Sequence, residues 1–226
     1  MNTFSFEELL VERAGLAGLT LESSCASALE VYFELLRRWN RKINLTGLDL
    51  DALTVEGMDR LFVEPLLGAR HLTPGTTRII DIGTGGGSPA IPLALASPAA
   101  SITMVESRTK KSVFLREVAR ELGLEAQVIT ARYEELLQQG TLLEAFDTLT
   151  SRALRLDSRD IAQVQSLVHS GGRLLLFRSA TTSDELALAP PLSLLKVDPL
   201  PRQGSQIVVL GKQGDNSVPR GTHDET

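Results

Sequence analysis

The sequence has few of the features that stabilise an extracellular protein or anchor a membrane protein. It contains one cysteine, Cys25, among 226 residues, so no intrachain disulfide can form, which is typical of a reducing compartment. The longest apolar stretch, residues 89–100, is interrupted by prolines and is far shorter than the roughly 20 residues of a membrane span. The first residues lack the basic and apolar segments of a secretory signal. We therefore expect a cytoplasmic protein that does not associate with membranes.

The sequence also lacks the residue sets of several common chemistries. Three histidines are scattered without metal-ligand spacing, and no serine–histidine–aspartate or cysteine–histidine set is evident. We therefore predict no metal site. The formal net charge is −5, so any nucleic-acid contact must come from local basic patches. The candidate clusters are Arg37, Arg38, Arg41 and Lys42, and Arg108, Lys110, Lys111, Arg116 and Arg120. Each could equally be a solvated helix face.

The first 72 residues show helical periodicity only. A capping box from Ser5 to Glu8 predicts a short helix that ends at Gly15. A longer helix follows, in which apolar residues from Cys25 to Ile43 recur at spacings of three and four. We interpret residues 1–72 as a helical N-terminal cap.

After Pro74-Gly75, short apolar runs alternate with helical segments. Predicted strands cover residues 78–82, 102–106, 126–129, 146–150 and 173–177, predicted helices cover 109–122 and about 159–168, and a hairpin of strands 192–197 and 206–210 lies at the sheet edge. Buried strands that alternate with helices predict an α/β fold with a doubly wound, mostly parallel sheet over residues 73–212. Residues 213–226 have almost no apolar side chains, which predicts a disordered tail.

The sharpest local signal is the glycine-rich turn DIGTGGGS, which runs from Asp81 to Ser88 at the end of the first predicted strand. Glycines let the chain turn tightly and let a ligand approach the backbone, although a turn without a ligand can have the same composition. The nicotinamide fingerprint has glycines at offsets 0, 2 and 5, and its third glycine would fall at Ser88. The spacing found, with Gly83, Gly85 and Gly87, is typical of S-adenosylmethionine (SAM) methyltransferases.

Two acidic residues suit this cofactor. SAM has no pyrophosphate but carries a cationic amine and a sulfonium, so Asp81 is useful where it would repel a phosphate. Glu106 closes the second predicted strand, where an acid can accept both ribose hydroxyls; the alternative for Glu106 is an exposed loop residue. We therefore predict a Rossmann-like, class I SAM-dependent methyltransferase domain over residues 73–212.

Four motifs are more specific than the fold. WNRKINLT begins at Trp39, DIGTGGGSPAIPL at Asp81, ESRTKKSVFL at Glu106 and TSRA at Thr150. In this order and at these intervals the chain resembles the bacterial RsmG (GidB) family, from about residue 29 to 177 and weakly to 210. The resemblance implies a SAM-dependent enzyme that methylates N7 of one guanine in 16S ribosomal RNA. It would act as a monomer on the RNA or on the small ribosomal subunit.

The resemblance also implies roles for individual residues. Gly83 and Ser88 would line the methionine end of the cofactor, Glu106 would take the ribose, and Tyr133 with Glu134 would flank the adenine. The full set of implied cofactor-binding residues is Asp81, Gly83, Gly85, Gly87, Ser88, Glu106, Tyr133, Glu134 and Arg152.

The implied chemistry fits the lack of a general base. Guanine N7 carries a lone pair and no proton, so positioning can supply most of the catalysis. Arg152 would lie beside the cofactor and the target base as the catalytic residue. Basic residues at the carboxyl ends of strands would bind the RNA backbone, namely Arg108, Lys110, Lys111, Arg155 and Arg178.

Three departures from the family pattern leave alternatives open. The glycine turn continues Ser88-Pro89-Ala90, where the family usually has an apolar residue, Pro and Gly. Residues 60–65 are RLFVEP, where the family commonly has Arg-His followed by Asp-Ser, so Leu61 stands in place of the His, and Arg178-Ser179 stands where Lys-Gly is frequent. One alternative is a degenerate, non-catalytic relative that binds RNA or a ribosomal partner. Another is a methyltransferase of the same fold that acts on a protein or a small molecule.

Overall fold

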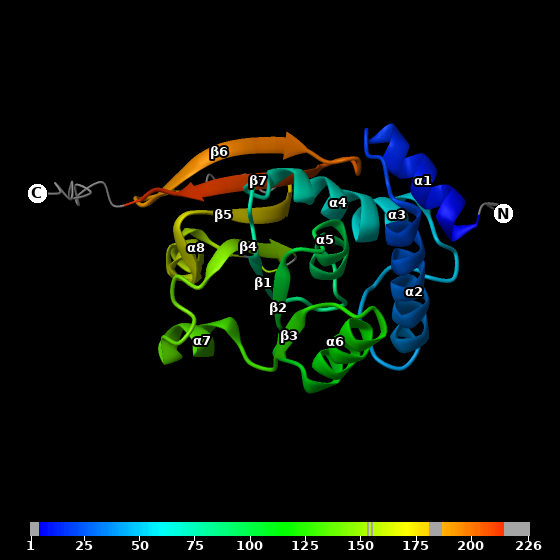
Figure 1. The fold of residues 1–226 in the computed structure, drawn as a ribbon, viewed down its shortest axis with the longest axis horizontal. Coiled ribbons are helices and arrows are strands. Elements are labelled where there is room, and N and C mark those ends of the chain that lie inside the picture. The colour runs from blue at the N-terminus through cyan, green and yellow to red at the C-terminus, as the bar shows by residue number, and fades with distance from the viewer. Residues whose placement is uncertain (1–4, 153, 155, 181–186, 215–226) are drawn as a thin grey trace, which may run out of the picture.

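A single seven-stranded sheet with helices on both faces organises the chain (Figure 1). It is seen in a computed structural model that describes residues 5–152, 154, 156–180 and 187–214. The predicted tail therefore lies outside the described residues except for positions 213 and 214. The strands are β1 (Arg78–Ile82), β2 (Ser101–Val105), β3 (Ala126–Ile129), β4 (Phe146–Arg152), β5 (Val168–Ser179), β6 (Leu192–Pro199) and β7 (Ser205–Lys212).

Helical elements occupy the N-terminal third of the described chain and the connections between strands. The α-helices are α1 (Phe6–Leu16), α2 (Ser23–Asn40), α3 (Val55–Met58), α4 (Glu64–Gly68), α5 (Ala90–Ala96), α6 (Thr109–Glu121), α7 (Tyr133–Gln139) and α8 (Ser158–Val164). A π-helix, η1 (Asp59–Val63), and two 3-10 helices, η2 (Ala69–His71) and η3 (Gln165–Leu167), complete the set.

The strand order is β3-β2-β1-β4-β5-β7-β6. Strands β1 to β5 are parallel to one another, and β7 pairs antiparallel with both β5 and β6. The order reverses at β1, so the carboxyl ends of β1, β2 and β4 meet at a topological switch point, where open α/β sheets bind ligands. The predicted doubly wound sheet and its edge hairpin are confirmed.

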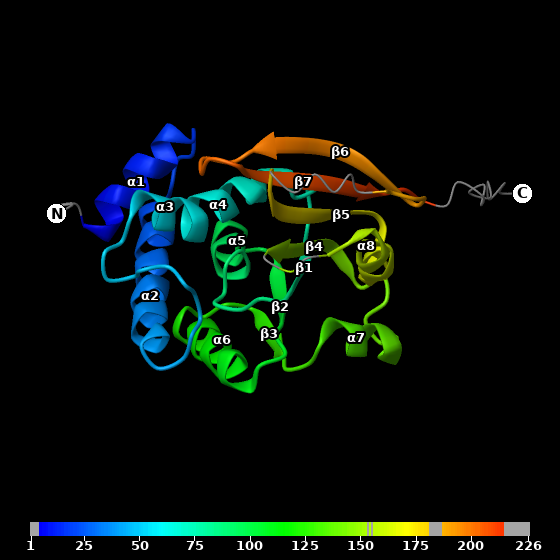
Figure 2. The ribbon, with the colours of Figure 1, turned by 180° about the vertical axis from the view of Figure 1, so that it is seen from behind.

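Adjacent residues of β1 pack on opposite faces of the sheet, which explains why the strand sequences are continuous apolar runs. Ile79 packs in the cluster that contains Phe62 of the N-terminal helices and Phe114 of α6, whereas Ile80 packs with Ile161 of α8 on the other face. Figure 2 shows α7 and α8 on the side of the sheet opposite α5 and α6. Both faces are buried, so the strand has no polar alternation.

The N-terminal helices follow the predicted pattern with two corrections. Helix α2 ends at Asn40, so Ile43 of the predicted stripe lies beyond it. Ser5 caps α1, and a complete capping box joins it to Glu8. The predicted end at Gly15 is wrong, because α1 continues to Leu16 and the chain turns at Gly18, whose φ is +71°. A left-handed residue is what ends such a helix, and glycine adopts it without a Cβ penalty.

The sheet region differs from the sequence prediction at several element boundaries. The helix predicted at about 159–168 ends at Val164 and is followed by η3 and then by β5. The second strand spans Ser101–Val105, one residue earlier than predicted. The fifth begins at Val168 instead of residue 173, because the Ser-Gly-Gly segment forms an irregularity within β5, with Gly171 at φ +89°, and not a loop before it. Helix α7 was not predicted; it has seven residues and no side-chain cap, so it leaves little periodicity to detect.

A histidine–aspartate pair joins β4 and β5 at the end of the sheet opposite the switch point. Asp147 Oδ2 accepts hydrogen bonds from the backbone N–H groups of Thr77 and Arg78, both at 2.7 Å, and Asp147 Oδ1 lies 2.8 Å from Nε2 of His169. Although burial opposes it, these bonds lower the pKa of Asp147. A hydrogen bond to the Ser170 carbonyl, followed by the bond to Asp147, raises the pKa of His169.

This pair predicts a pH-dependent stability. Asp147 stabilises the fold above its unfolded pKa of 3.8, and this contribution is lost as the pH falls through the lowered pKa of the folded state. His169 stabilises the fold below its unfolded pKa of 6.5, and this contribution is lost as the pH rises through the raised pKa of the folded state. We expect Asp147→Asn to reduce the free energy of unfolding by about 1–2 kcal/mol near pH 5 and by less at pH 9. Urea denaturation at both pH values, with Glu121→Gln as the exposed control, measures this. A loss of equal size at pH 5 and pH 9 would contradict it.

Candidate active site

A cavity of about 510 Å³ opens at the carboxyl ends of β1, β2 and β4, at the switch point of the sheet. Its wall combines the glycine turn, the end of β2, the start of α7, the end of β4 and two N-terminal segments. The lining residues are Leu36, Leu45, Thr46, Arg60, Leu61, Gly83, Thr84, Gly85, Gly86, Ser88, Val105, Glu106, Ser107, Arg108, Lys111, Ala131, Arg132, Tyr133, Glu134, Arg152 and Leu154.

The glycine turn has the left-handed backbone that its composition predicts. Gly83, Gly85 and Gly87 have φ values of +70°, +59° and +98°. The N–H of Gly83 donates to the Val105 carbonyl at 2.9 Å, which fixes the turn against the neighbouring strand β2. Gly83 and Gly85 line the cavity, whereas Gly87 does not, and a Cβ at Gly87 would lie 3.0 Å from the Tyr32 hydroxyl.

Asp81 lies beneath the turn and does not line the cavity. Its carboxylate is fully buried; Oδ1 accepts a hydrogen bond of 2.6 Å from the Thr150 hydroxyl, and Oδ2 has no hydrogen-bond partner among the described residues. Burial raises the pKa of Asp81 to about 7, against the opposing hydrogen bond from Thr150. Asp81 therefore makes no contact with the cavity, and its predicted role toward a cationic cofactor rests on its charge.

Glu106 lies directly after β2, at the predicted position on the cavity wall. One carboxylate oxygen accepts from the Gly85 N–H at 2.9 Å, and the other accepts from the Arg108 N–H at 2.8 Å. The residue is 6% exposed. Each oxygen keeps a lone pair for a ligand, and the two backbone bonds hold the carboxylate in one orientation.

The start of α7 forms the far side of the cavity. Tyr133 and Glu134 both line it, as predicted. The hydroxyl of Tyr133 donates to Asp160 at 3.2 Å, and burial together with that carboxylate raises the pKa of Tyr133 to about 12. The phenol is therefore occupied elsewhere, and the tyrosine contributes its ring and backbone to the cavity.

Arg152 ends β4 and lies on the cavity wall with a side chain that is 9% exposed. Its guanidinium lies over the Phe177 ring, 4.5 Å from the centroid, and its Nη1 donates to the Arg60 carbonyl. Nη2 is 3.4 Å from a Glu64 oxygen, yet neither Nη2 nor Nε makes a hydrogen bond with any described residue. Burial lowers the pKa of Arg152 to about 10, opposed by Glu64, so the side chain stays cationic near neutral pH.

Because of the π-helix η1 and Pro65, two backbone carbonyl groups beside the cavity lack their usual helical hydrogen bonds and accept from side chains instead. In an α-helix the N–H of Glu64 would bond to the Arg60 carbonyl, but here it bonds to the Asp59 carbonyl. The Arg60 carbonyl accepts from Arg152 instead. Proline has no N–H to offer the Leu61 carbonyl four residues earlier, and that carbonyl accepts from the Ser88 hydroxyl at 3.0 Å.

Comparison with known proteins identifies the family of the chain. The family described as rRNA small subunit methyltransferase G (GidB) matches residues 25–197. The chain belongs to this family. A relative named ribosomal RNA small subunit methyltransferase G from Syntrophotalea carbinolica is 35% identical over 211 residues, which cover 87% of this chain and 93% of that protein. One of the same name from Xylella fastidiosa strain M23 is 36% identical over 178 residues, covering 78% of this chain and 80% of that protein.

Solved structures support the fold. A SAM-dependent methyltransferase from Aquifex aeolicus has a TM-score of 0.52 at 12% identity, covering 67% of this chain and 90% of that chain. An rRNA methylase from Streptococcus thermophilus has a TM-score of 0.51 at 13% identity, covering 66% of this chain and 95% of that chain. Both are similar in fold to this member of the methyltransferase G family.

The structure explains the first motif of this methyltransferase G family member. In WNRKINLT, the Asn40 side chain accepts from the backbone N–H groups of Leu45 and Thr46 at 2.9 and 3.0 Å. The loop is thereby held against the glycine turn, where Leu45 and Thr46 line the cavity. Sequence reasoning assigns neither residue to the site, although both lie in the quoted motif.

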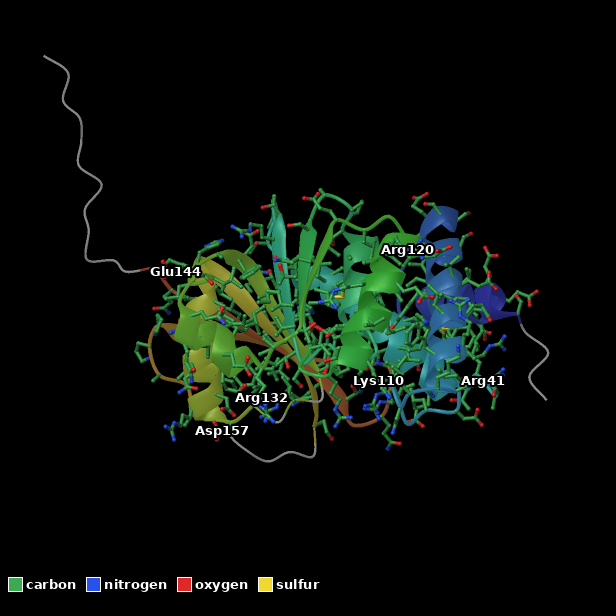
Figure 3. The ribbon with its side chains drawn as sticks, turned by 90° about the horizontal axis from the view of Figure 1, so that it is seen from below. Arg41, Lys110, Arg120, Arg132, Glu144 and Asp157 are labelled. Carbon is green, nitrogen blue, oxygen red and sulfur yellow. The ribbon has the colours of Figure 1, made fainter. Side chains whose placement is uncertain are left out.

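The two basic clusters differ in their partners. In the N-terminal cluster, Arg37, Arg38 and Arg41 pair with Glu34, Glu117 and Asp51. The second cluster is divided along α6: Figure 3 shows Lys110 with Arg132 at the edge that holds the cavity, whereas Arg120, which pairs with Glu121, lies toward the opposite edge with Glu144.

The predicted RNA-binding residues take different places. Arg108 and Lys111 line the cavity, and Lys110 is exposed beside it on the first turn of α6. Arg178 lies outside the cavity wall and lines a smaller hollow with Ser151 and Leu154. Arg155 lies outside the described residues.

Other cavity residues were missed by sequence reasoning. Arg60, Thr84, Ser107 and Arg132 line the cavity and were not assigned to it. Thr84 and Ser107 lie within quoted motifs and Arg132 precedes Tyr133, so their positions carried a signal. Arg60 lies outside the four motifs and carried none.

Proposed function

We propose that this chain transfers a methyl group from SAM to N7 of a guanine in 16S ribosomal RNA. The observation that carries this proposal is the meeting of the left-handed glycine turn, the fixed carboxylate of Glu106 and the buried, incompletely bonded Arg152 at one cavity. Relatives that are 35% and 36% identical are named for rRNA small-subunit methylation.

The cavity fits SAM in size and in donor set. About 510 Å³ is within the range of small-molecule sites. Glu106 is placed to accept the ribose hydroxyls, Tyr133 and Glu134 to flank the adenine, and Gly83 with Ser88 to border the methionine end. When bound, SAM supplies a methyl group on an electrophilic sulfonium.

The protein then has to orient the base and to keep water away. N7 of guanine attacks through its lone pair, so no residue has to remove a proton, and holding the base in line can supply a large part of the rate enhancement. Arg152 lies on the cavity wall, and a guanidinium there is suited to donate to O6, which lies next to N7 on the same edge of guanine. The Phe177 ring below the guanidinium restricts its movement.

The basic rim supports a polyanionic substrate. Arg108, Lys110 and Lys111 lie on or beside the cavity wall at the start of α6, in a chain of net charge −5. Phosphate contacts of this kind give affinity that falls steeply with salt and carry little sequence choice.

The test is transfer of labelled methyl from SAM to small ribosomal subunits from cells that lack their own enzyme of this family, followed by nucleoside analysis. We expect label in 7-methylguanosine, with a rate that falls as salt rises. The Gly83→Val variant, purified in parallel, controls for host enzymes. No label, with an active family member as the positive control, would refute the proposal. SAM binding without transfer would then favour another substrate, and no SAM binding would favour a degenerate relative.

A further inference from the structure

A buried ion network links Arg152 to the connection between β6 and β7, far along the chain. The Glu64 side chain is 2% exposed; one of its oxygens lies 3.4 Å from Arg152 Nη2, and the other lies 3.7 Å from Arg202 Nε. Arg202 in turn donates through Nη1 to Glu56 on α3 at 3.4 Å. Positive and negative groups thus alternate from Arg152 to Glu56.

Glu64 needs more than one cation. A buried carboxylate without adequate compensation carries a large desolvation cost, and Glu64 Oε1 has no hydrogen bond among the described residues. If Arg152 alone neutralised Glu64, the attraction would draw its guanidinium away from the cavity and into the protein. With Arg202 beside the other oxygen, Arg152 lies on the cavity wall, where its guanidinium stacks on Phe177 and its buried Nε and Nη2 make no hydrogen bond with a described residue.

We propose that Arg202 is a positioning residue for methyl transfer, which acts by sharing Glu64 so that the Arg152 side chain is held on the cavity wall. The proposal rests on the proposed function for the role of Arg152. Its geometry does not depend on that function, so it can be tested by two independent readouts.

The first readout is the rate of transfer in a single turnover. We expect Arg202→Gln to lower this rate about tenfold and to leave the Kd for SAM within about twofold, and we expect Arg202→Lys to recover most of the rate. Lys196→Ala is the matched control, because it removes a positive charge from the same hairpin without approaching Glu64. In a Glu64→Gln background, Arg202→Gln should have little further effect, since the shared carboxylate is already neutral.

The second readout is the Nε–H NMR signal of Arg152, assigned by its loss in Arg152→Lys. We expect Arg202→Gln to shift this signal and Lys196→Ala to leave it in place. An unchanged signal in folded Arg202→Gln, or an equal loss of rate in both Glu64 backgrounds, would overturn the proposal. If the wild-type protein transfers no methyl to RNA but the signal still shifts, the proposed function fails while the positioning of Arg152 stands.

Discussion

Replacing Gly83 with valine is expected to abolish measurable SAM binding while the sheet stays folded. Gly83 has φ +70°, which a β-branched residue rarely adopts. A Cβ at this position would lie 2.5 Å from the Leu154 side chain, on the cavity wall. The added bulk therefore has to displace either the turn or Leu154, and both border the space for the ligand.

Gly123→Val is the matched control for the backbone penalty. Gly123 has φ +61°, and a Cβ at this position would lie in open space with no neighbour within 4 Å, so its replacement costs conformational strain without touching the cavity. Isothermal titration with SAM and thermal unfolding compare the two variants. We expect both variants to lose a similar amount of stability, about 1–2 kcal/mol. We expect SAM binding to be lost only in Gly83→Val. Unchanged affinity in Gly83→Val would remove the turn from the binding site.

Asp81→Asn is expected to weaken SAM binding and to stabilise the protein at pH 8. Because burial raises the pKa of Asp81 from 3.8 to about 7, the unfolded chain ionises first as the pH rises. Stability therefore falls between these two values, by about 4 kcal/mol if the whole shift is realised. Asparagine removes that cost and can still accept the hydrogen bond from Thr150.

The same charge attracts the cationic cofactor. We expect the affinity of the wild-type protein for SAM to fall roughly tenfold as the pH is lowered through about 7, because Asp81 then takes up a proton. In Asp81→Asn the affinity should be low and nearly independent of pH.

Titration calorimetry between pH 6 and 8.5 and urea denaturation at pH 8 measure these effects. Asp147→Asn is the control, because the pKa of Asp147 is lowered, so its removal should destabilise the protein. A wild-type affinity that is flat across pH 7 would contradict the role of Asp81.

Features set by local sequence could be predicted. Strand β1 and the turn after it were placed correctly because an apolar run meets three glycines that the backbone requires at positive φ. Glu106 could be placed because it follows a buried strand by one position.

Features set by contacts distant in sequence could not be predicted. Nothing near Asp81 indicated that its carboxylate would lie under the turn with Thr150, 69 residues away in sequence. The π-helix η1 leaves no periodic signal, and the contact of Glu64 with Arg202 joins segments that only the complete sheet brings together. The departure at Ser88 supplies a hydroxyl that donates to the backbone carbonyl of Leu61, a bond that does not involve the Leu61 side chain.

The strand order also affects how the chain can be synthesised. β7 is the last strand along the described chain, yet it lies between β5 and β6. Until residue 212 has left the ribosome, β5 is an open edge that carries Leu174 and Leu176, both buried in the finished sheet. A nascent or truncated chain that ends before β7 is therefore prone to associate through this edge, so the full length of the sheet is a requirement for a product that does not aggregate.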